Sequence, residues 1–261
     1  MWRLFLATGL SLLLGSSARA SSLQVSPTLM EFQPGQRAQG LWLRNSGDAP
    51  IHAQVRVQHW SQTDHKDTLD PTHNIVASPP FIAIAPHAEQ LVRIVPVEPP
   101  TDTEQAYRLL IDELPETQSD GAPKPAGLTF LIRYSIPIFL SATSAVPSNP
   151  DHSSGRDTPI TDLAGLQATL NIPSPSDRTG TLVVTNTGRQ HIKISELAFL
   201  NTRGSKTILS KGLLGYVLPH SQMSWTLHDL PAPATLSNGK FEGKINEDLG
   251  AQELPITIRL P

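Results

Sequence analysis

The residues of this chain that could bind a metal are histidines and carboxylates, because the sequence contains no cysteine. His59, His65 and His73 flank a polar stretch that also carries Asp64 and Asp67. These histidines have neither the His-x-x-x-His spacing of a helical metal motif nor the His-x-His spacing of a strand motif. We therefore interpret them as solvated loop residues, and we expect no metal and no cofactor.

The sequence also lacks the patterns that catalysis requires. Asp112 and Glu113 are adjacent carboxylates, but neighbouring side chains on a strand point to opposite faces and cannot act together as an acid–base pair. There is no Gly-x-Ser-x-Gly motif, no phosphate-binding glycine loop and no dinucleotide-binding glycine pattern. We predict that the protein is not an enzyme and has no small-molecule substrate.

Composition narrows the class of protein further. The 261 residues predict one or two domains. A formal charge of −3, from 20 Lys+Arg against 23 Asp+Glu, argues against binding to nucleic acid, because phosphate neutralisation needs a clustered basic surface. The 24 prolines disfavour a helical protein, since interior proline breaks helices.

The first twenty residues have the layout of a secretory signal peptide. A short basic start at residues 1–3 precedes an apolar run at residues 4–15, and Ala18-Arg19-Ala20 offers a small-x-small cleavage site. The apolar run is too short to cross a membrane, which takes about twenty residues. We predict export, cleavage after Ala20 and no membrane insertion.

The mature chain consists of short alternating runs separated by turns, which is typical of a β-sandwich. The stretch LWLRNSG at residues 41–47 is repeated in outline as LVVTNTG at residues 182–188, and each is followed within a few residues by isoleucine. The turns Pro86-His87 and Pro219-His220 correspond in the same way. The repeat indicates two domains of one type, although turns also look alike because they use few residue types.

We therefore predict an all-β protein with two immunoglobulin-like sandwich domains. The predicted order is a signal peptide at residues 1–20, a first domain at 21–145, a linker at 146–159 and a second domain at 160–261. The linker boundary rests on a stretch rich in Ser, Pro and Asp.

Residues 128–140 (LTFLIRYSIPIFL) have an apolar side chain at every even position. Extended, they span roughly 43 Å, whereas a typical sandwich strand covers about 17–20 Å. Pro137 favours an edge strand because it cannot donate to a ladder, and a long apolar edge aggregates unless it is covered. Two explanations stay open: the strand bends at Pro137 to serve two sheets of its own domain, or it adds to another protein's sheet.

The first half of the mature chain carries a series of motifs in a fixed order: SPTLMEF at residues 26–32, LWLRNSG at 41–47, SPP at 78–80, QLVRI at 90–94, YRLLIDELP at 107–115 and IPIF at 136–139. In this order they resemble the PapD-like periplasmic chaperones of the chaperone–usher pilus pathway. The last two motifs are similar to the archaic branch of that family. The second domain matches only in outline, through Asn186-Thr187-Gly188.

The resemblance implies a boomerang of two immunoglobulin-like domains that works in the periplasm. Such chaperones capture pilus subunits that lack a strand, lend them a strand of their own, and deliver them to an outer-membrane usher. The donor side chains implied by position are Leu128, Phe130 and Ile132, with Tyr134 as a fourth. Pilus subunits and the usher are thus the expected partners.

Classical members of the family hold the subunit's terminal carboxylate between two cations. The matching positions here are Leu29 and Pro137, and neither carries a charge. Because a buried carboxylate needs a cationic partner, we take Arg93 and Arg133 as the candidate anchor. The alternative is that both arginines are solvated strand residues.

The resemblance also concerns the cleft between the domains. Glu104 falls where the family has an acidic residue near this cleft. The arginine that usually pairs with that acid is replaced by Ser141. We therefore do not expect the usual salt bridge.

Two other classes of protein fit the sequence less well. A secreted structural or adhesin subunit of a surface fibre would be a single domain with an N-terminal donor extension, whereas the long alternating strand here is internal. A free-standing sandwich that binds sugar or metal would need aromatic platforms or clustered ligands. The four Trp and three Tyr are widely spread, so the sequence favours the chaperone.

Overall fold

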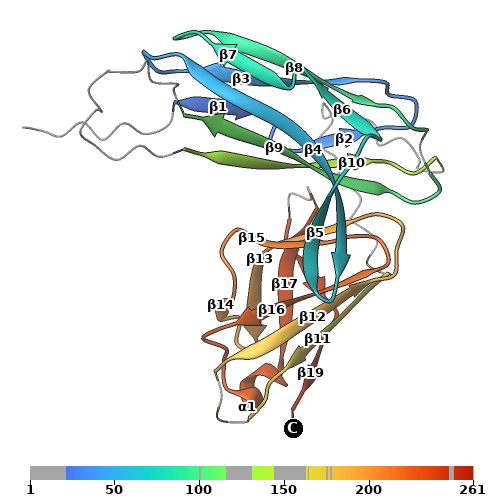
Figure 1. Ribbon diagram of the computed structural model, residues 1–261. Coiled ribbons are helices and arrows are strands. Elements are labelled where there is room, and N and C mark those ends of the chain that lie inside the picture. The colour runs from blue at the N-terminus through green and yellow to red at the C-terminus, as the bar shows by residue number, and fades with distance from the viewer. Residues whose placement is uncertain are drawn as a thin grey trace, which may run out of the picture.

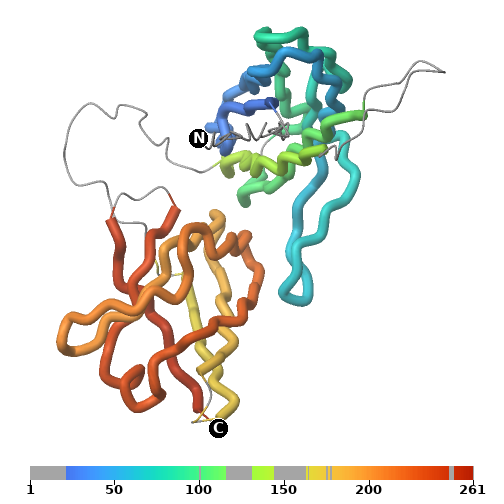
Figure 2. Tube along the Cα trace, turned by 90° about the vertical axis from the view of Figure 1, so that its left-hand side faces the viewer, coloured from blue at the N-terminus to red at the C-terminus, as the bar shows by residue number. Residues whose placement is uncertain are grey.

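The computed structural model describes residues 22–99, 101–115, 131–143, 163, 165–174, 176, 178–246 and 250–260. Within these ranges the chain forms β-strands and one short helix, α1 (Pro233–Leu236). Two sandwiches meet at an angle and give the molecule the shape of an L (Figure 1 and Figure 2). The prediction of two immunoglobulin-like sandwiches is confirmed. The predicted signal peptide and the predicted linker lie outside the described residues.

The first sandwich packs two sheets around one apolar core. One sheet has the order β1–β3–β8–β6, formed by β1 (Leu23–Ser26), β3 (Gln39–Asn45), β8 (Glu89–Pro96) and β6 (Ile75–Ser78). The other has the order β2–β10–β9–β4–β5, with β7 also paired to β4, formed by β2 (Met30–Phe32), β10 (Arg133–Leu140), β9 (Gln105–Leu114), β4 (Ile51–Thr63), β5 (Lys66–Pro71) and β7 (Phe81–Ile84). Alternate residues of both sheets fill the core, among them Leu41, Leu109 and Ile138.

The second sandwich repeats this plan. One sheet has the order β16–β12–β11–β19, formed by β16 (Ser221–Leu227), β12 (Gly180–Asn186), β11 (Leu166–Asn171) and β19 (Ile256–Arg259). The other has the order β14–β13–β17–β18, with β15 also paired to β13, formed by β14 (Lys206–Ile208), β13 (Ile192–Asn201), β17 (Gly239–Ile245), β18 (Gln252–Leu254) and β15 (Leu213–Val217). Its core is separate and includes Leu170, Leu182 and Phe199.

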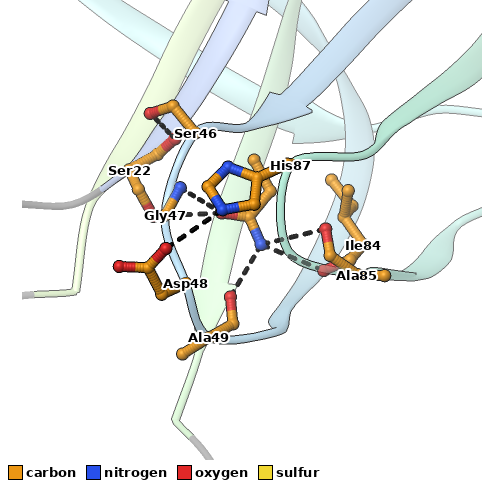
Figure 3. A network of polar contacts seen from close by, with 9 residues as sticks. Ser22, Ser46, Gly47, Asp48, Ala49, Ile84, Ala85 and His87 are labelled. Carbon is orange, nitrogen blue, oxygen red and sulfur yellow. Dashed lines mark hydrogen bonds and ion pairs between the residues drawn. The ribbon is translucent and has the colours of Figure 1, made fainter.

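Asn45, the asparagine of the first Asn-x-Gly motif, is fully buried at the end of β3. Its side-chain amide donates hydrogen bonds to the carbonyl groups of Ala49, Ile84 and Ala85, at 2.7, 3.1 and 3.2 Å. Its side-chain oxygen accepts from the N–H of Gly47 at 2.9 Å, and Figure 3 shows this network. Asn45 therefore ties the turn after β3 to β7, which belongs to the opposite sheet.

Asn186 makes the corresponding contacts in the second sandwich. It is 1% exposed, and its amide donates to the carbonyls of Gln190 and Val217, at 2.7 and 3.0 Å. Its side-chain oxygen accepts from the N–H of Gly188 at 2.9 Å. The repeat in the sequence thus has a physical cause: each sandwich uses a buried asparagine to join its two sheets.

The hairpin of β4 and β5 reaches from the first sandwich to the second (Figure 1). The Gln62 amide donates to the carbonyl of Tyr216 at 2.9 Å and accepts from the N–H of Leu218 at 2.8 Å. Asp67 on β5 accepts from the Gln62 amide at 2.9 Å and from the Trp60 indole N–H at 2.8 Å. Beside these bonds lies a buried interdomain cluster that consists of Trp60, Ala106, Phe139 and Leu218.

We expect Asn45→Ala to lower the free energy of unfolding by about 1–3 kcal/mol, because the substitution leaves buried carbonyl groups without a donor. Urea unfolding followed by circular dichroism measures the change. Asn238→Ala is the matched control, since this exposed asparagine makes one local bond, to the carbonyl of Ala234 at 3.0 Å. Equal stability of the two variants would contradict a structural role for the Asn45 network.

Candidate functional site

Strand β10 lies between β9 and β2, but the two neighbours cover it unequally. β9 pairs with it from Arg133 to Leu140, whereas β2 pairs only with Ile138, Phe139 and Leu140. Among the described residues, no strand pairs with residues 133–137 on the side away from β9. We call residues 133–137 on this side the open edge of β10.

The hydrogen bonds at the two ends of β10 show which backbone groups point toward the open edge. The N–H of Glu113 donates to the carbonyl of Ile132 at 3.1 Å, so even residues of β10 face β9. The N–H of Ser141 donates to the carbonyl of Phe32 at 2.9 Å, so odd residues face the side of β2. The backbone groups of Arg133 and Ser135 therefore point out of the sheet.

Pro137 stands where the covered and open parts of β10 meet. Pro137 is an odd residue, so its backbone nitrogen, which carries no hydrogen, faces away from β9. The proline therefore removes no bond from the ladder with β9. The β9–β10 register continues through it without a shift. The described part of the strand therefore stays in one sheet and does not bend at Pro137 into a second one.

The apolar stripe of even residues passes from inside the sandwich to its end. Ile136, Ile138 and Leu140 are buried in the core. Tyr134 packs partly buried against the same core, and its hydroxyl donates to the carbonyl of Leu23. Ile132 is half-buried and lies outside the core cluster. Of the four predicted donor residues, Ile132 thus extends past the core and Tyr134 contacts it.

The other two predicted donor residues, Leu128 and Phe130, lie outside the described residues. They share the even parity of the stripe.

Arg133 lies on the outer face of the sheet and shares a carboxylate with Arg56. Asp112 accepts hydrogen bonds from both guanidinium groups. Desolvation opposes ionisation of Asp112, but the bonds from Arg133 and Arg56 outweigh it and lower the pKa of this carboxyl. These three residues line a shallow hollow of about 510 Å³ beside Leu131 and Ile132. Two guanidinium groups share Asp112, so this group of three carries a net positive charge.

Arg93 does not lie near Arg133, so the predicted anchor pair does not form one site. Arg93 belongs to β8 in the opposite sheet, where it pairs in register with Gly40 and Ser78. Val92 and Ile94 fill the core, so the side chain of Arg93 points outward and is exposed. The whole core separates it from the outer face that carries Arg133.

Arg108 on β9 is a cation at the interdomain cleft that the sequence analysis did not single out. Its guanidinium lies 3.7 Å from the centroid of the Trp60 ring and 5.5 Å from that of Tyr216. Desolvation lowers the pKa of Arg108 from its usual value, and attraction to Asp67 opposes this shift. No described carboxylate forms an ion pair with Arg108. The sequence did carry a signal for this position. Arg108 and Asp112 are both even residues of one strand, so their side chains share the outer face of the sheet.

The described histidines are spread over the structure and do not lie together. Within the described ranges, no group of three His, Asp or Glu side chains is arranged to hold a metal ion. His59 is not the loop residue that we expected. It lies on β4 and packs edge-on against Tyr107, with ring centroids 5.7 Å apart.

Comparison with known proteins connects this geometry to a family. Residues 22–144 match the model of the pili and flagellar-assembly chaperone family, PapD N-terminal domain. A comparison with curated protein sequences gives no match. The first sandwich belongs to the PapD N-terminal domain family, which is a family of chaperones and not of enzymes.

Solved structures extend the likeness over both sandwiches. The crystal structure of the CsuC–CsuE chaperone–tip adhesion subunit pre-assembly complex, from archaic chaperone–usher Csu pili of Acinetobacter baumannii, matches with a TM-score of 0.64 and 24% identity, over 92% of this chain and 100% of that one. The YadV chaperone matches with a TM-score of 0.58 and 18% identity, over 89% of this chain and 98% of that one. The Salmonella enterica SafA pilin–SafB chaperone complex matches with a TM-score of 0.57 and 19% identity, over 91% of this chain and 99% of that one.

The first sandwich therefore carries the chaperone domain that its motifs resemble, and this resemblance is confirmed. Over both sandwiches the chain has the fold of solved pilus chaperones. Its membership of the archaic branch stays a prediction. In the part of the chain that the structure describes, no helix is long and apolar enough to cross a membrane.

Proposed function

We propose that this protein captures pilus subunits in the periplasm by donor-strand complementation and delivers them to an outer-membrane usher. The open edge of β10 is the observation that carries the proposal. Arg133 and Ser135 offer backbone donors and acceptors there, and the apolar stripe continues beyond the core at Ile132. An incoming strand that pairs with this edge would bring its own sheet beside the stripe.

The donated side chains are Leu128, Phe130 and Ile132. Tyr134 stays with the chaperone's own core, against which it packs. Three fully buried side chains at roughly 1.5–3 kcal/mol each stabilise the complex by about 5–9 kcal/mol. The conformational entropy lost when the donor segment becomes ordered is not subtracted from this figure. This is enough to stabilise a subunit that lacks one strand of its sandwich.

The cation that receives an acidic group of the subunit is Arg108, and Arg133 assists near the other end of the open edge. Arg108 is half-buried and stacked on Trp60, so its position is fixed before a ligand arrives. No described carboxylate forms an ion pair with it, and Asp67 attracts it only from a greater distance. Arg93 has no part in this site because it lies on the opposite face of the sandwich.

Export through the signal peptide at residues 1–20, cleaved after Ala20, would deliver the chaperone to the compartment where it meets subunits and usher. The total absence of cysteine suits this compartment, because no disulfide can mispair.

Ile132→Asp is expected to abolish capture of a pilus subunit while the chaperone remains folded, because the substitution places a carboxylate in the subunit's core. Co-expression with a pilus subunit from the same organism, followed by pull-down, measures capture. Leu131→Asp is the matched control: it is the neighbouring residue, 49% exposed, and it points to the opposite face of an extended chain.

Circular dichroism and thermal unfolding of both variants separate binding from folding. If Ile132→Asp unfolds the chaperone, Ile132 belongs to its own core and the donor assignment is wrong. If folded Ile132→Asp still recovers the subunit as well as Leu131→Asp does, the stripe does not enter the subunit.

Arg108→Ala is expected to weaken subunit binding roughly 10- to 100-fold, the effect of losing a hydrogen bond between charged groups. Arg108→Lys, which keeps the charge, should retain part of the affinity. Arg44→Ala is the control, because this exposed arginine pairs with Glu89, and both lie on the sheet that does not contain β10. Titration of purified chaperone with a pilus subunit measures the affinities, and wild-type affinity of Arg108→Ala would exclude Arg108 from the site.

A further inference from the structure

An exposed tryptophan lies on the face of the first sandwich that points away from β10. This is the outer face of the sheet β1–β3–β8–β6, and the core separates it from the interdomain cluster on the other sheet. Figure 1 shows this sheet on the far side of the first sandwich from the second one. Trp42 of β3 points outward there and is 50% exposed, whereas its neighbours Leu41 and Leu43 are fully buried. Half of this large aromatic side chain is thus open to solvent.

Apolar side chains lie next to Trp42 on the same face. Leu91 of β8 is its partner in register and is half-buried. A Cβ atom at Gly40 would lie 2.8 Å from Leu91 Cδ1, so the leucine lies over the glycine and extends the apolar surface along β3. Val76 of β6 adds an apolar side chain that is 42% exposed. Exposed apolar patches of this kind mark protein–protein contacts, and tryptophan is enriched among the residues that dominate binding energy there.

Three charged side chains point outward from these four strands: Arg44 of β3, and Glu89 and Arg93 of β8. Arg44 and Glu89 are exposed and lie 3.8 Å apart. Arg93 is exposed and forms no ion pair with a described residue. Glu89 and Arg93 lie two residues to either side of Leu91, so β8 presents a negative, an apolar and a positive side chain in succession on one face.

This order of charges is complementary to itself. In a pair of chains related by a two-fold axis, each contact of one residue with another occurs twice, once in each direction. When two copies stack this sheet face to face, with the axis along the row of Trp42 and Leu91, their β8 strands run antiparallel. Glu89 of each copy then lies over Arg93 of the other copy, and the two Trp42 side chains meet. Arg44 of each copy faces Gly40 of the other, so no like charges are opposed.

We propose that the outer face of the sheet β1–β3–β8–β6 binds a second copy of this chain in that arrangement. Packed sheets lie about 10 Å apart with their strands within about 30° of each other, and their facing side chains interdigitate. Trp42 is the central apolar contact, and the two Glu89–Arg93 pairs set the register. The interface contains no residue of the open edge of β10, so each copy keeps that edge and the proposal does not depend on subunit capture.

Analytical ultracentrifugation of the full mature chain over a concentration series measures this association. The wild type should shift from one chain towards two as its concentration rises through the micromolar range. Trp42→Ala should weaken the association roughly 30-fold or more, the effect of losing a dominant interface residue. A wild type that remains a single chain up to about 1 mM would overturn the inference.

Charge reversal tests the arrangement itself. Arg93→Glu opposes acid to acid across the axis, and Glu89→Arg opposes base to base, so each variant alone should remain a single chain. An equimolar mixture of the two variants should form dimers, because every acid then meets a base of the other copy. Both positions are exposed, and circular dichroism confirms that each variant is folded.

Ile132→Asp is the control for association through the apolar stripe of β10 instead. This variant should form dimers as the wild type does, because Ile132 lies on the other sheet's side of the core. A mixture of the two charge variants that stays monomeric, a charge variant that dimerises alone as well as the wild type, or association that is lost in folded Ile132→Asp would each overturn the inference.

Discussion

A β-strand presents hydrogen-bonding groups on two edges, and among the described residues β10 has a partner along the whole of one edge and along only part of the other. β9 covers one edge throughout, whereas β2 covers the other only from Ile138 to Leu140. An exposed sheet edge next to an apolar stripe is a site for aggregation unless another strand covers it. The donor-strand proposal follows from this constraint, because the same groups that create the hazard are those that an incomplete sandwich needs.

The rest of the molecule holds this edge in place. The core fixes the inner face of β10 through Ile136 and Ile138, and the second sandwich holds its outer face through His191 and Phe139. The Gln62 amide and the Trp60 cluster fix the angle between the sandwiches. In this arrangement Arg108 lies at the cleft, on the outer face of the sheet that carries the open edge.

Patterns of period two predicted most of the fold, because side chains on a strand alternate between core and solvent. They predicted the sandwiches and the apolar stripe of residues 128–140, of which the structure describes Ile132 to Leu140. The Asn-x-Gly repeat contained the two asparagines that are buried, Asn45 and Asn186. They could not place Arg93 and Arg133, because parity gives the face of a sheet but not which of two sheets a strand joins. For the same reason the contact of Glu104 with His191, 87 residues apart, has no local signal.

Amide hydrogen exchange at individual residues of β10 tests the central claim most directly, in the free chaperone and in its complex with a pilus subunit. The amides of Arg133 and Ser135 should exchange quickly in the free protein and become protected in the complex. The amides of Tyr134 and Ile136, which face β9, should be protected in both. Arg133 and Ser135 amides that are protected in the free monomer, or that still exchange quickly in the complex, would contradict this account.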